Sequence, residues 1–180
     1  MGATIHPSAH VSKKAEVGDG TLIWHEVQIR EGAKVGRNCR LGKCVYIGKN
    51  VVVGDGCKIQ NRATLYQGVR VGNNVFIGPH VVFTNDLYPR AASTSWKIVP
   101  TTVEDGSSIG ANSTILCGIT IGENAMIGAV SVVTKDVGPH ELVFGNPASR
   151  HGYVCACGRI LDENYRCSHC KRKIDIGAFK

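Results

Sequence analysis

An apolar residue recurs at every sixth position through most of this chain of 180 residues. The series runs from Ile5 to Phe83, breaks once, and resumes from Val103 to Val133, and all twenty of its positions are aliphatic or aromatic. Ten of the twenty are followed directly by glycine, and a small or medium-sized residue usually stands four positions later. Self-similarity at a fixed period over this length indicates a hexapeptide-repeat solenoid.

A period of six fits neither an amphipathic helix nor a single alternating strand. It fits short strands with a turn every six residues, where glycine relieves backbone strain at the corners. Three hexads then make a triangular coil of eighteen residues, and six to seven coils stack at about 4.8 Å around an aliphatic core. Cys39 and Cys57 are eighteen apart at the small inward position, so we expect them to stack in this core as small hydrophobic residues.

The repeat ends near Val137, which predicts a β-helix domain over 1–150, with an inserted loop at about 85–100, and a separate mini-domain over 151–180. No apolar stretch is long enough to span a membrane and no signal segment is evident, so the sequence predicts a cytoplasmic protein. The net charge is +7, but the Lys and Arg residues are scattered with few aromatics among them. This pattern favours phosphorylated small molecules over nucleic acid as ligands.

The tail contains two close pairs of cysteines separated by a hairpin-length spacer. The four residues are Cys155, Cys157, Cys167 and Cys170. Two such pairs suit four thiolates around one tetrahedral Zn²⁺, as in a zinc ribbon, with Gly158 easing the turn after the first pair. His169 could replace one cysteine, and free thiols or a disulfide are the alternatives, although a cytoplasmic setting disfavours a disulfide. A closed four-ligand site would be structural.

The irregular segment between Phe83 and Val103 is expected to carry the active site, because the coils themselves present repetitive surfaces. Loops on rigid scaffolds commonly carry function; the alternative is an insertion that only packs on a coil face. The segment includes Arg90, Trp96 and Ile98. Exposed apolar residues such as Trp96 and Ile98 predict contacts with neighbouring chains of a homotrimer.

Several runs in and around this loop carry a more specific resemblance. They are KIQNRATLYQGV, NVFIGPHVVFTNDLYPRA, IGANSTILCGITIG, IGAVSVVTKDV and FGNPASR. Over residues 4–150 the chain resembles the sugar-nucleotide 3-N-acetyltransferases, which acetylate UDP-2-acetamido-3-amino-2,3-dideoxy-glucuronate or dTDP-3-amino-3,6-dideoxyhexoses for surface polysaccharide synthesis, including lipopolysaccharide. The resemblance implies a left-handed parallel β-helix, a homotrimer with sites between neighbouring prisms, and acetyl-CoA as co-substrate.

By the same resemblance, Asn85 accepts a hydrogen bond from the sugar amine and aims its lone pair at the thioester. Gln67 stands eighteen residues earlier, where relatives often carry Glu; its amide cannot act as a general base at neutral pH. The departing CoA thiolate would then take the ammonium proton. Positioning of the two substrates would supply most of the acceleration, since effective molarities reach about 10⁵ M or more.

Two histidines are rival bases, because other hexapeptide acyltransferases use one. His80 lies five residues before Asn85 and is a catalytic candidate, whereas His25 follows Ile23 and Trp24 in an early coil and is read as structural. We also considered a γ-class carbonic anhydrase, which shares the implied fold and holds Zn²⁺ through three histidines. The sequence lacks that group's close His pair.

Gln60, Asn61 and Tyr66 are expected to form a polar platform for the nucleotide sugar beside Gln67, with solvated corner residues as the alternative reading. Arg90 would pair with a pyrophosphate or a carboxylate.

For CoA, the resemblance suggests that backbone groups of Ala111 and Ala129, one coil apart, receive the pantetheine arm. Lys135 and Arg150 would then bind the phosphates of CoA, and Pro147 the adenine.

Three functions follow from these residues. The first is acetyl transfer from acetyl-CoA to the 3-amino group of a nucleotide-linked sugar. The second is acyl transfer to a 4-amino or hydroxyl group on the same scaffold. The third is a noncatalytic trimeric scaffold whose zinc tail binds a partner, which Asn85 and the long loop disfavour because a scaffold needs neither.

Overall fold

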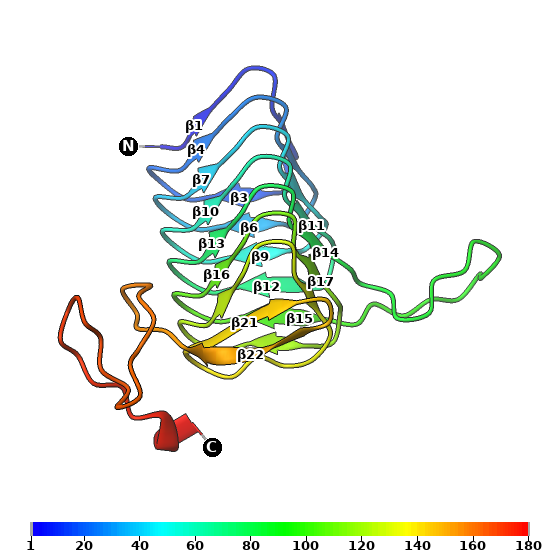
Figure 1. The fold of residues 1–180 in the computed structure, drawn as a ribbon. Coiled ribbons are helices and arrows are strands. Elements are labelled where there is room, and N and C mark those ends of the chain that lie inside the picture. The colour runs from blue at the N-terminus through cyan, green and yellow to red at the C-terminus, as the bar shows by residue number, and fades with distance from the viewer. Residues whose placement is uncertain (1, 180) are drawn as a thin grey trace.

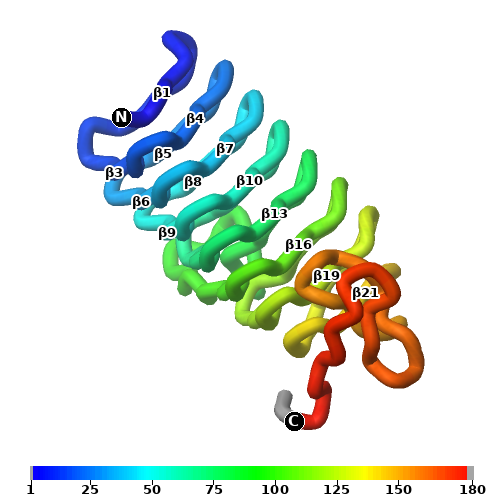
Figure 2. The backbone as a smooth tube through the Cα atoms, turned by 90° about the vertical axis from the view of Figure 1, so that its left-hand side faces the viewer, coloured from blue at the N-terminus to red at the C-terminus, as the bar shows by residue number. Residues whose placement is uncertain are grey.

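The computed structural model describes residues 2–179, and it confirms a β-helix in which short strands wind into a three-sided prism (Figures 1 and 2). Followed from β1, the coil turns in the left-handed sense as it descends (Figure 1). Each turn contributes one strand to each of three parallel sheets. The period of six residues in the sequence is therefore the length of one side of the prism.

The three sheets consist of strands two to six residues long. The first sheet contains β1 (Thr4–Ile5), β4 (Leu22–Ile23), β7 (Arg40–Leu41), β10 (Lys58–Ile59), β13 (Phe76–Ile77), β16 (Ser108–Ile109), β19 (Met126–Ile127), β21 (Glu141–Gly145) and β22 (Ala148–Tyr153). The second contains β2 (His10–Val11), β5 (Gln28–Ile29), β8 (Tyr46–Ile47), β11 (Thr64–Leu65), β14 (Val82–Phe83), β17 (Thr114–Ile115) and β20 (Val132–Val133). The third contains β3 (Glu16–Val17), β6 (Lys34–Val35), β9 (Val52–Val53), β12 (Val69–Val71), β15 (Thr101–Val103) and β18 (Thr120–Ile121). A short 3₁₀ helix, η1 (Ile176–Phe179), follows in the tail.

The core is the stack of residues that the repeat predicts. From Ile23 to Val133 every sixth-position residue of the series is buried, whereas Ile5 is 45% exposed because no coil covers the first turn. Cys39 and Cys57 are fully buried, and each thiol donates to a glycine carbonyl of the next coil, at 3.1 Å. Burial of each large aliphatic side chain stabilises the fold by about 1.5–3 kcal/mol.

The three corners of the prism take their names here from the sheet whose strands precede them. The first corner includes residues 60–62, 78–80, 110–112 and 128–130; the second includes 66–68, 84–85 and 116–118; the third includes 54–56, 72–74 and 104–106. Residues eighteen apart share a corner, as the strand register requires. Residues six apart lie at different corners.

The coil does not end where the repeat does. After Val137 the chain adds β21 to the first sheet, in parallel register with β19, and β22 then returns antiparallel to it. Residues 141–145 therefore continue the first sheet beyond the end of the repeat, without keeping the hexad spacing. The Asn146–Pro147 peptide bond in the hairpin between β21 and β22 is cis.

Candidate active site

Polar residues of three successive coils stack at the second corner, where the inserted loop leaves the prism. The strand register pairs Thr64 with Val82 and Phe83 with Ile115, so Gln67, Asn85 and Cys117 occupy equivalent positions one coil apart. Lys135 continues this column by the same register. The expected stacking of Asn85 and Gln67, eighteen residues apart, is thus reproduced, while the place of the buried Cys117 in the column was missed because the loop interrupts the count.

The side-chain amide of Asn85 is held in one orientation. Its Nδ2 donates a hydrogen bond to the backbone carbonyl oxygen of Gln67, at 3.1 Å. Only the NH₂ end of the amide can make this bond, so Oδ1 is the acceptor that remains. Within residues 2–179, Oδ1 has no hydrogen-bond partner. The coil therefore presents a fixed, half-buried hydrogen-bond acceptor at the base of the loop.

The base of the loop is tied to the coils above and below it. The Val99 N–H donates to the carbonyl of Asn85, and the Thr101 N–H donates to the carbonyl of Gly68. Gly68 has a φ of +104°, and a Cβ there would lie 2.7 Å from Ile98 Cγ2. Glycine is required at this corner because any side chain would push the returning arm of the loop away from Asn85.

Beyond its base, the loop extends away from the prism (Figure 1). Residues 86–88 and 95–100 of its two arms line a cleft of about 540 Å³. Tyr88 is 84% exposed and Trp96 is 57% exposed. Arg90 is exposed near the tip and donates only to the carbonyl of Pro89, at 2.7 Å. The loop does not pack on a coil face of its own chain, which argues against the inert-insertion reading.

The first corner presents backbone donors instead of an acceptor. Ala111 and Ala129 are one coil apart in the register of β16 and β19, and their N–H groups make no hydrogen bond among the residues described. At Lys43, in the same column, the N–H is satisfied by Asn61 Oδ1 at 2.9 Å. Ala111 and Ala129 lack such a cap because no Asn or Asp stands one coil below either of them. These N–H groups can therefore donate to a ligand at the first corner.

His80 belongs to this first corner too. It has a φ of +59°, and its side chain is exposed. His80 and Asn85 lie at opposite ends of β14, which separates them by about 16 Å at 3.3 Å per residue. One chain therefore does not bring His80 to Asn85.

The expected polar platform is divided between two corners. Gln60 and Asn61 lie at the first corner, whereas Tyr66 and Gln67 lie at the second. Asn61 is already used to cap the coil above, and Tyr66 packs edge-on against Tyr46 with ring centroids 5.8 Å apart. The prediction of a single platform within one chain is wrong, because residues six positions apart lie at different corners of the prism.

The residues expected to bind CoA are also distributed. Pro147 lies in the hairpin that follows Phe144, which packs beneath Gly128 at the first corner, so it extends the column of Ala111 and Ala129. Arg150 lies within β22, where its guanidinium donates to Glu141 at 3.0 Å and to the Tyr153 hydroxyl at 3.0 Å. Lys135 belongs to the second corner.

His25 fits its structural reading. Its ring lies 3.6 Å from that of His6 and stacks on Trp24 in the first two coils, remote from the loop.

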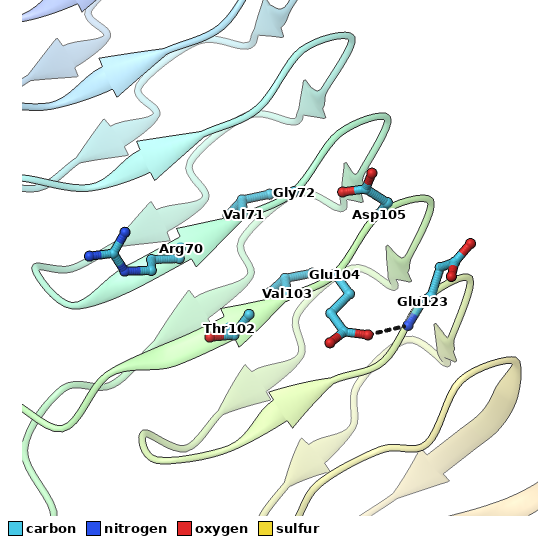
Figure 3. A pocket seen from close by; sticks show the side chains of 8 residues that line it. All are labelled: Arg70, Val71, Gly72, Thr102, Val103, Glu104, Asp105 and Glu123. Carbon is cyan, nitrogen blue, oxygen red and sulfur yellow. Dashed lines mark hydrogen bonds between the residues drawn. The ribbon is translucent and has the colours of Figure 1, made fainter. Parts of the chain in front are cut away.

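A second cleft, of about 520 Å³, lies on the third sheet and is shown in Figure 3. Its carboxylate groups accept hydrogen bonds that hold neighbouring coils together. Asp105 accepts hydrogen bonds from the backbone and side-chain nitrogens of Asn73, which lower the pKa of this carboxyl, and Glu104 accepts from the Glu123 N–H. Arg70 points away from these carboxylates (Figure 3). This cleft offers no convergent set of groups for chemistry.

The four tail cysteines come together in space. Their sulfurs all lie within 4.8 Å of one another, and among residues 2–179 they form the only cluster of three or more potential metal ligands of the Cys, His or carboxylate type. His169 is exposed and lies outside the cluster. The Cys170 backbone N–H donates to Cys167 Sγ and lowers the pKa of that thiol to about 6, which favours the thiolate that metals bind. The cluster could hold a metal ion.

Comparison with known proteins supports the fold. Perosamine N-acetyltransferase from Caulobacter crescentus, solved with CoA and GDP-perosamine, is 23% identical over 84% of this chain and 57% of its own, with a TM-score of 0.56. The acetyltransferase domain of PglB from Neisseria gonorrhoeae is 22% identical over 83% of this chain and 57% of its own, with a TM-score of 0.54. AntD, an N-acyltransferase from Bacillus cereus solved with dTDP and coenzyme A, is 15% identical over 85% of this chain and 82% of its own, with a TM-score of 0.54.

The chain thus spans less than two thirds of the length of the first two of these proteins. A search of curated protein sequences gave no significant match. No helix among residues 2–179 has the length and hydrophobicity needed to cross a bilayer.

Two repeat families match the sequence itself. The bacterial transferase hexapeptide (six repeats) matches residues 14–49 and 50–85, and the hexapeptide repeat of succinyl-transferase matches residues 32–67 and 100–135. Together these matches span the coils on both sides of the loop and more than half of the chain. The coils on both sides of the loop thus carry the hexapeptide repeats that these two family models describe.

Proposed function

We propose that this protein transfers an acetyl group from acetyl-CoA to the 3-amino group of a nucleotide-linked sugar. The observation that carries the proposal is the fixed amide of Asn85, whose Oδ1 remains available at the base of an extended loop. A neutral acceptor at this point binds an amine N–H and leaves the nitrogen lone pair free to attack. A scaffold protein would have no use for it.

In this reaction the amine donates one N–H to Asn85 Oδ1, and its lone pair forms the new C–N bond at the thioester carbonyl. The tetrahedral intermediate then collapses with cleavage of the C–S bond, and the CoA thiolate takes the ammonium proton. No side chain has to accept that proton, which agrees with Gln67 in place of a carboxylate beside Asn85. Orientation of two bound substrates supplies the acceleration, and such effects are worth up to about 7–11 kcal/mol.

The backbone N–H groups of Ala111 and Ala129 would hydrogen-bond the pantetheine arm of acetyl-CoA, with Pro147 beside the adenine at the end of the same column. Lys135 and Arg150 are the cations proposed for the CoA phosphates. Because these amides lie at the first corner and Asn85 at the second, one chain cannot supply both halves of the site. The proposal therefore includes a homotrimer, in which the first corner of one chain faces the second corner of its neighbour.

The loop supports this assembly. Its two arms leave the second corner and expose Tyr88 and Trp96, so the loop can reach a neighbouring chain and cover the nucleotide sugar there. Arg90 at the tip would pair with the pyrophosphate or with a uronate carboxylate. Perosamine N-acetyltransferase, which shares the fold, binds CoA together with a nucleotide sugar.

The test is a panel of UDP- and dTDP-linked 3-amino and 4-amino sugars incubated with acetyl-CoA and purified protein. Products are identified by mass spectrometry rather than by a thiol reagent, because the protein has eight cysteines of its own, none of them in a disulfide. We expect an acetamido product from at least one 3-amino sugar. Acetylation of 4-amino sugars alone would overturn the 3-amino assignment and make the 4-amino group the acceptor. The absence of a product from every amine would overturn the proposed function. Light scattering that gives a 19.3 kDa monomer would overturn the interchain site.

A further inference from the structure

The tail after β22 is built from two tight turns, each carrying one cysteine pair. The first contains Cys155 and Cys157, with the Gly158 N–H donating to the Cys155 carbonyl at 2.7 Å. In the second, the Lys171 N–H donates to the Cys167 carbonyl at 3.0 Å. Gly158 and Lys171 directly follow the last cysteine of their pair, and both have positive φ, of +82° and +61°. The first turn closes over three residues and the second over four, and in both a residue with positive φ directly follows the second cysteine.

The separations of the four sulfurs fit a tetrahedral metal site. Cys155 and Cys170 sulfurs are 3.4 Å apart, Cys157 and Cys167 sulfurs are 3.5 Å apart, and all four lie within 4.8 Å of one another. Four ligands at the usual Zn–S distance of about 2.3 Å are separated by about 3.8 Å, which falls inside this range. A disulfide requires about 2.05 Å between sulfurs, and none of the four forms one.

This tail has too little hydrophobic core to fold by itself. Its buried cluster consists of Cys155, Leu161 and Cys167, with Tyr153, Cys170 and Ile174 partly buried against it. Segments below about 40 residues usually need a metal, disulfides or a partner to fold. Because half of this small cluster is cysteine, the source of stability has to be at the thiols.

The same segment is docked on the last coil through a few specific contacts. The Val154 N–H donates to the His140 carbonyl at 2.8 Å, and the Val154 carbonyl lies 2.8 Å from His140 Nδ1. Tyr165 packs edge-on against Tyr153 of β22, with ring centroids 5.6 Å apart. Each of these contacts involves a residue adjacent to a cysteine or two positions from one, so the fold of the turns decides whether they form.

We propose that Cys155, Cys157, Cys167 and Cys170 bind one structural Zn²⁺, and that this ion holds residues 154–176 folded against the last coil of the β-helix. Four thiolates close the coordination sphere, so the ion has no open position for substrate. Binding releases the protons of whichever thiols are still protonated. The proposal is independent of acetyl transfer, because it rests on the tail alone.

The experiment measures metal in the full-length protein purified without chelator. Elemental analysis should give one Zn per chain for the wild type and for Cys44→Ser, a control at a corner cysteine outside the cluster, and a loss of most of the Zn in Cys157→Ser. Replacement of Zn²⁺ by Co²⁺ should give the absorption of a tetrahedral thiolate complex, which reports the ligand type directly. Absence of Zn, or disulfides among these four residues under nonreducing mass spectrometry, would overturn the site.

Limited proteolysis tests the structural role. Removal of Zn²⁺ by a chelator should open the chain to cleavage beyond about residue 153, while the β-helix remains resistant because its aliphatic core is separate. Cys157→His, which keeps four ligands, should restore both Zn and resistance if Cys157→Ser folds poorly. Equal resistance of the tail with and without Zn²⁺ would overturn the claim that the ion holds it folded.

Discussion

The second and third corners of the prism use the same residue types in opposite ways. At the third corner, Asp55, Asn73 and Asp105 each accept a hydrogen bond from a backbone N–H one coil above, at 2.6 to 2.9 Å. At the second corner, Asn85 donates to the carbonyl above it, and its oxygen stays free. A side-chain acceptor that caps a coil stabilises the stack, whereas one turned away from the coil is available to a ligand.

The two corners also differ in how the chain continues from them. At the third corner the chain turns within three residues and leaves a backbone N–H exposed, which the Asn or Asp below can cap. At the second corner the chain departs into the loop at Asn85 and returns at Val99, so the strand ends are joined by the Asn85 carbonyl and the Val99 N–H. Four of the five substitutions below separate a stabilising role from a catalytic one at these two corners, and the fifth tests His80 at the first corner.

The largest expected effect is on catalysis, from Asn85→Ala. Loss of the oriented acceptor should lower kcat/KM by roughly 10²-fold, about 2.7 kcal/mol of transition-state stabilisation. The free energy of unfolding should fall by no more than about 1 kcal/mol, for the lost side-chain bond to the Gln67 carbonyl, because the Asn85–Val99 backbone bond remains. Steady-state kinetics and denaturant unfolding on the same preparation measure both.

Gln67→Ala is the matched control, since Asn85 bonds only the backbone carbonyl of Gln67. Its kcat should stay within about tenfold of the wild type, with any loss appearing as weaker substrate binding. An equal loss of kcat in both variants would show that the Gln67 side chain, rather than the Asn85 oxygen, carries the chemistry.

Much of this molecule could be predicted from the sequence because the coils repeat. The sixth-position series located the strands, the core and the stacking of Asn85 under Gln67. The same period could also have shown that Asn61 and Gln67, six residues apart, lie at different corners, but a platform was expected there from residue type alone.

Other features have no periodic signal. The direction of the Asn85 amide depends on how the loop closes, a contact between Asn85 and Val99 that no hexad pattern records. β21 likewise continues the first sheet through hydrogen bonding with β19, not through the spacing of its apolar residues.

His80→Asn should have a smaller effect. Asparagine tolerates the positive φ at this position, so the variant tests the imidazole without straining the corner. We expect kcat within about tenfold of the wild type. The pH profile should follow ionisation of the sugar amine and rise as the neutral amine forms. Loss of turnover with binding intact, together with a limb near pH 6.5 in the wild type, would identify His80 of a neighbouring chain as the base.

Asn73→Ala at the third corner is the counterpart of Asn85→Ala at the second, with the expected effect on stability instead of catalysis. It removes the Asn73 side-chain bonds to the Asp55 N–H and to Asp105, and should lower the free energy of unfolding by about 1–3 kcal/mol, since each of the two bonds is worth about 0.5–1.5 kcal/mol. The activity of the folded protein should be unchanged, because the third corner faces away from the loop. Reduced kcat/KM without reduced stability would remove the distinction between the two corners.

The smallest effect concerns pH and Asp105. The Asn73 backbone N–H and then its side chain lower the pKa of this carboxyl from its ordinary value of 3.8. A depressed folded-state pKa contributes stability above the unfolded value and loses it as pH falls through the folded value. Asp105→Asn keeps an oxygen for the Asn73 N–H but has no charge to titrate. The wild type should therefore exceed this variant in denaturant midpoint at about pH 7, and the difference should shrink as the pH falls below the ordinary value of 3.8. A difference that stays constant over this range would mean that Asp105 stabilises the corner by shape and hydrogen bonding alone, as Asn73 does, and that its charge contributes nothing.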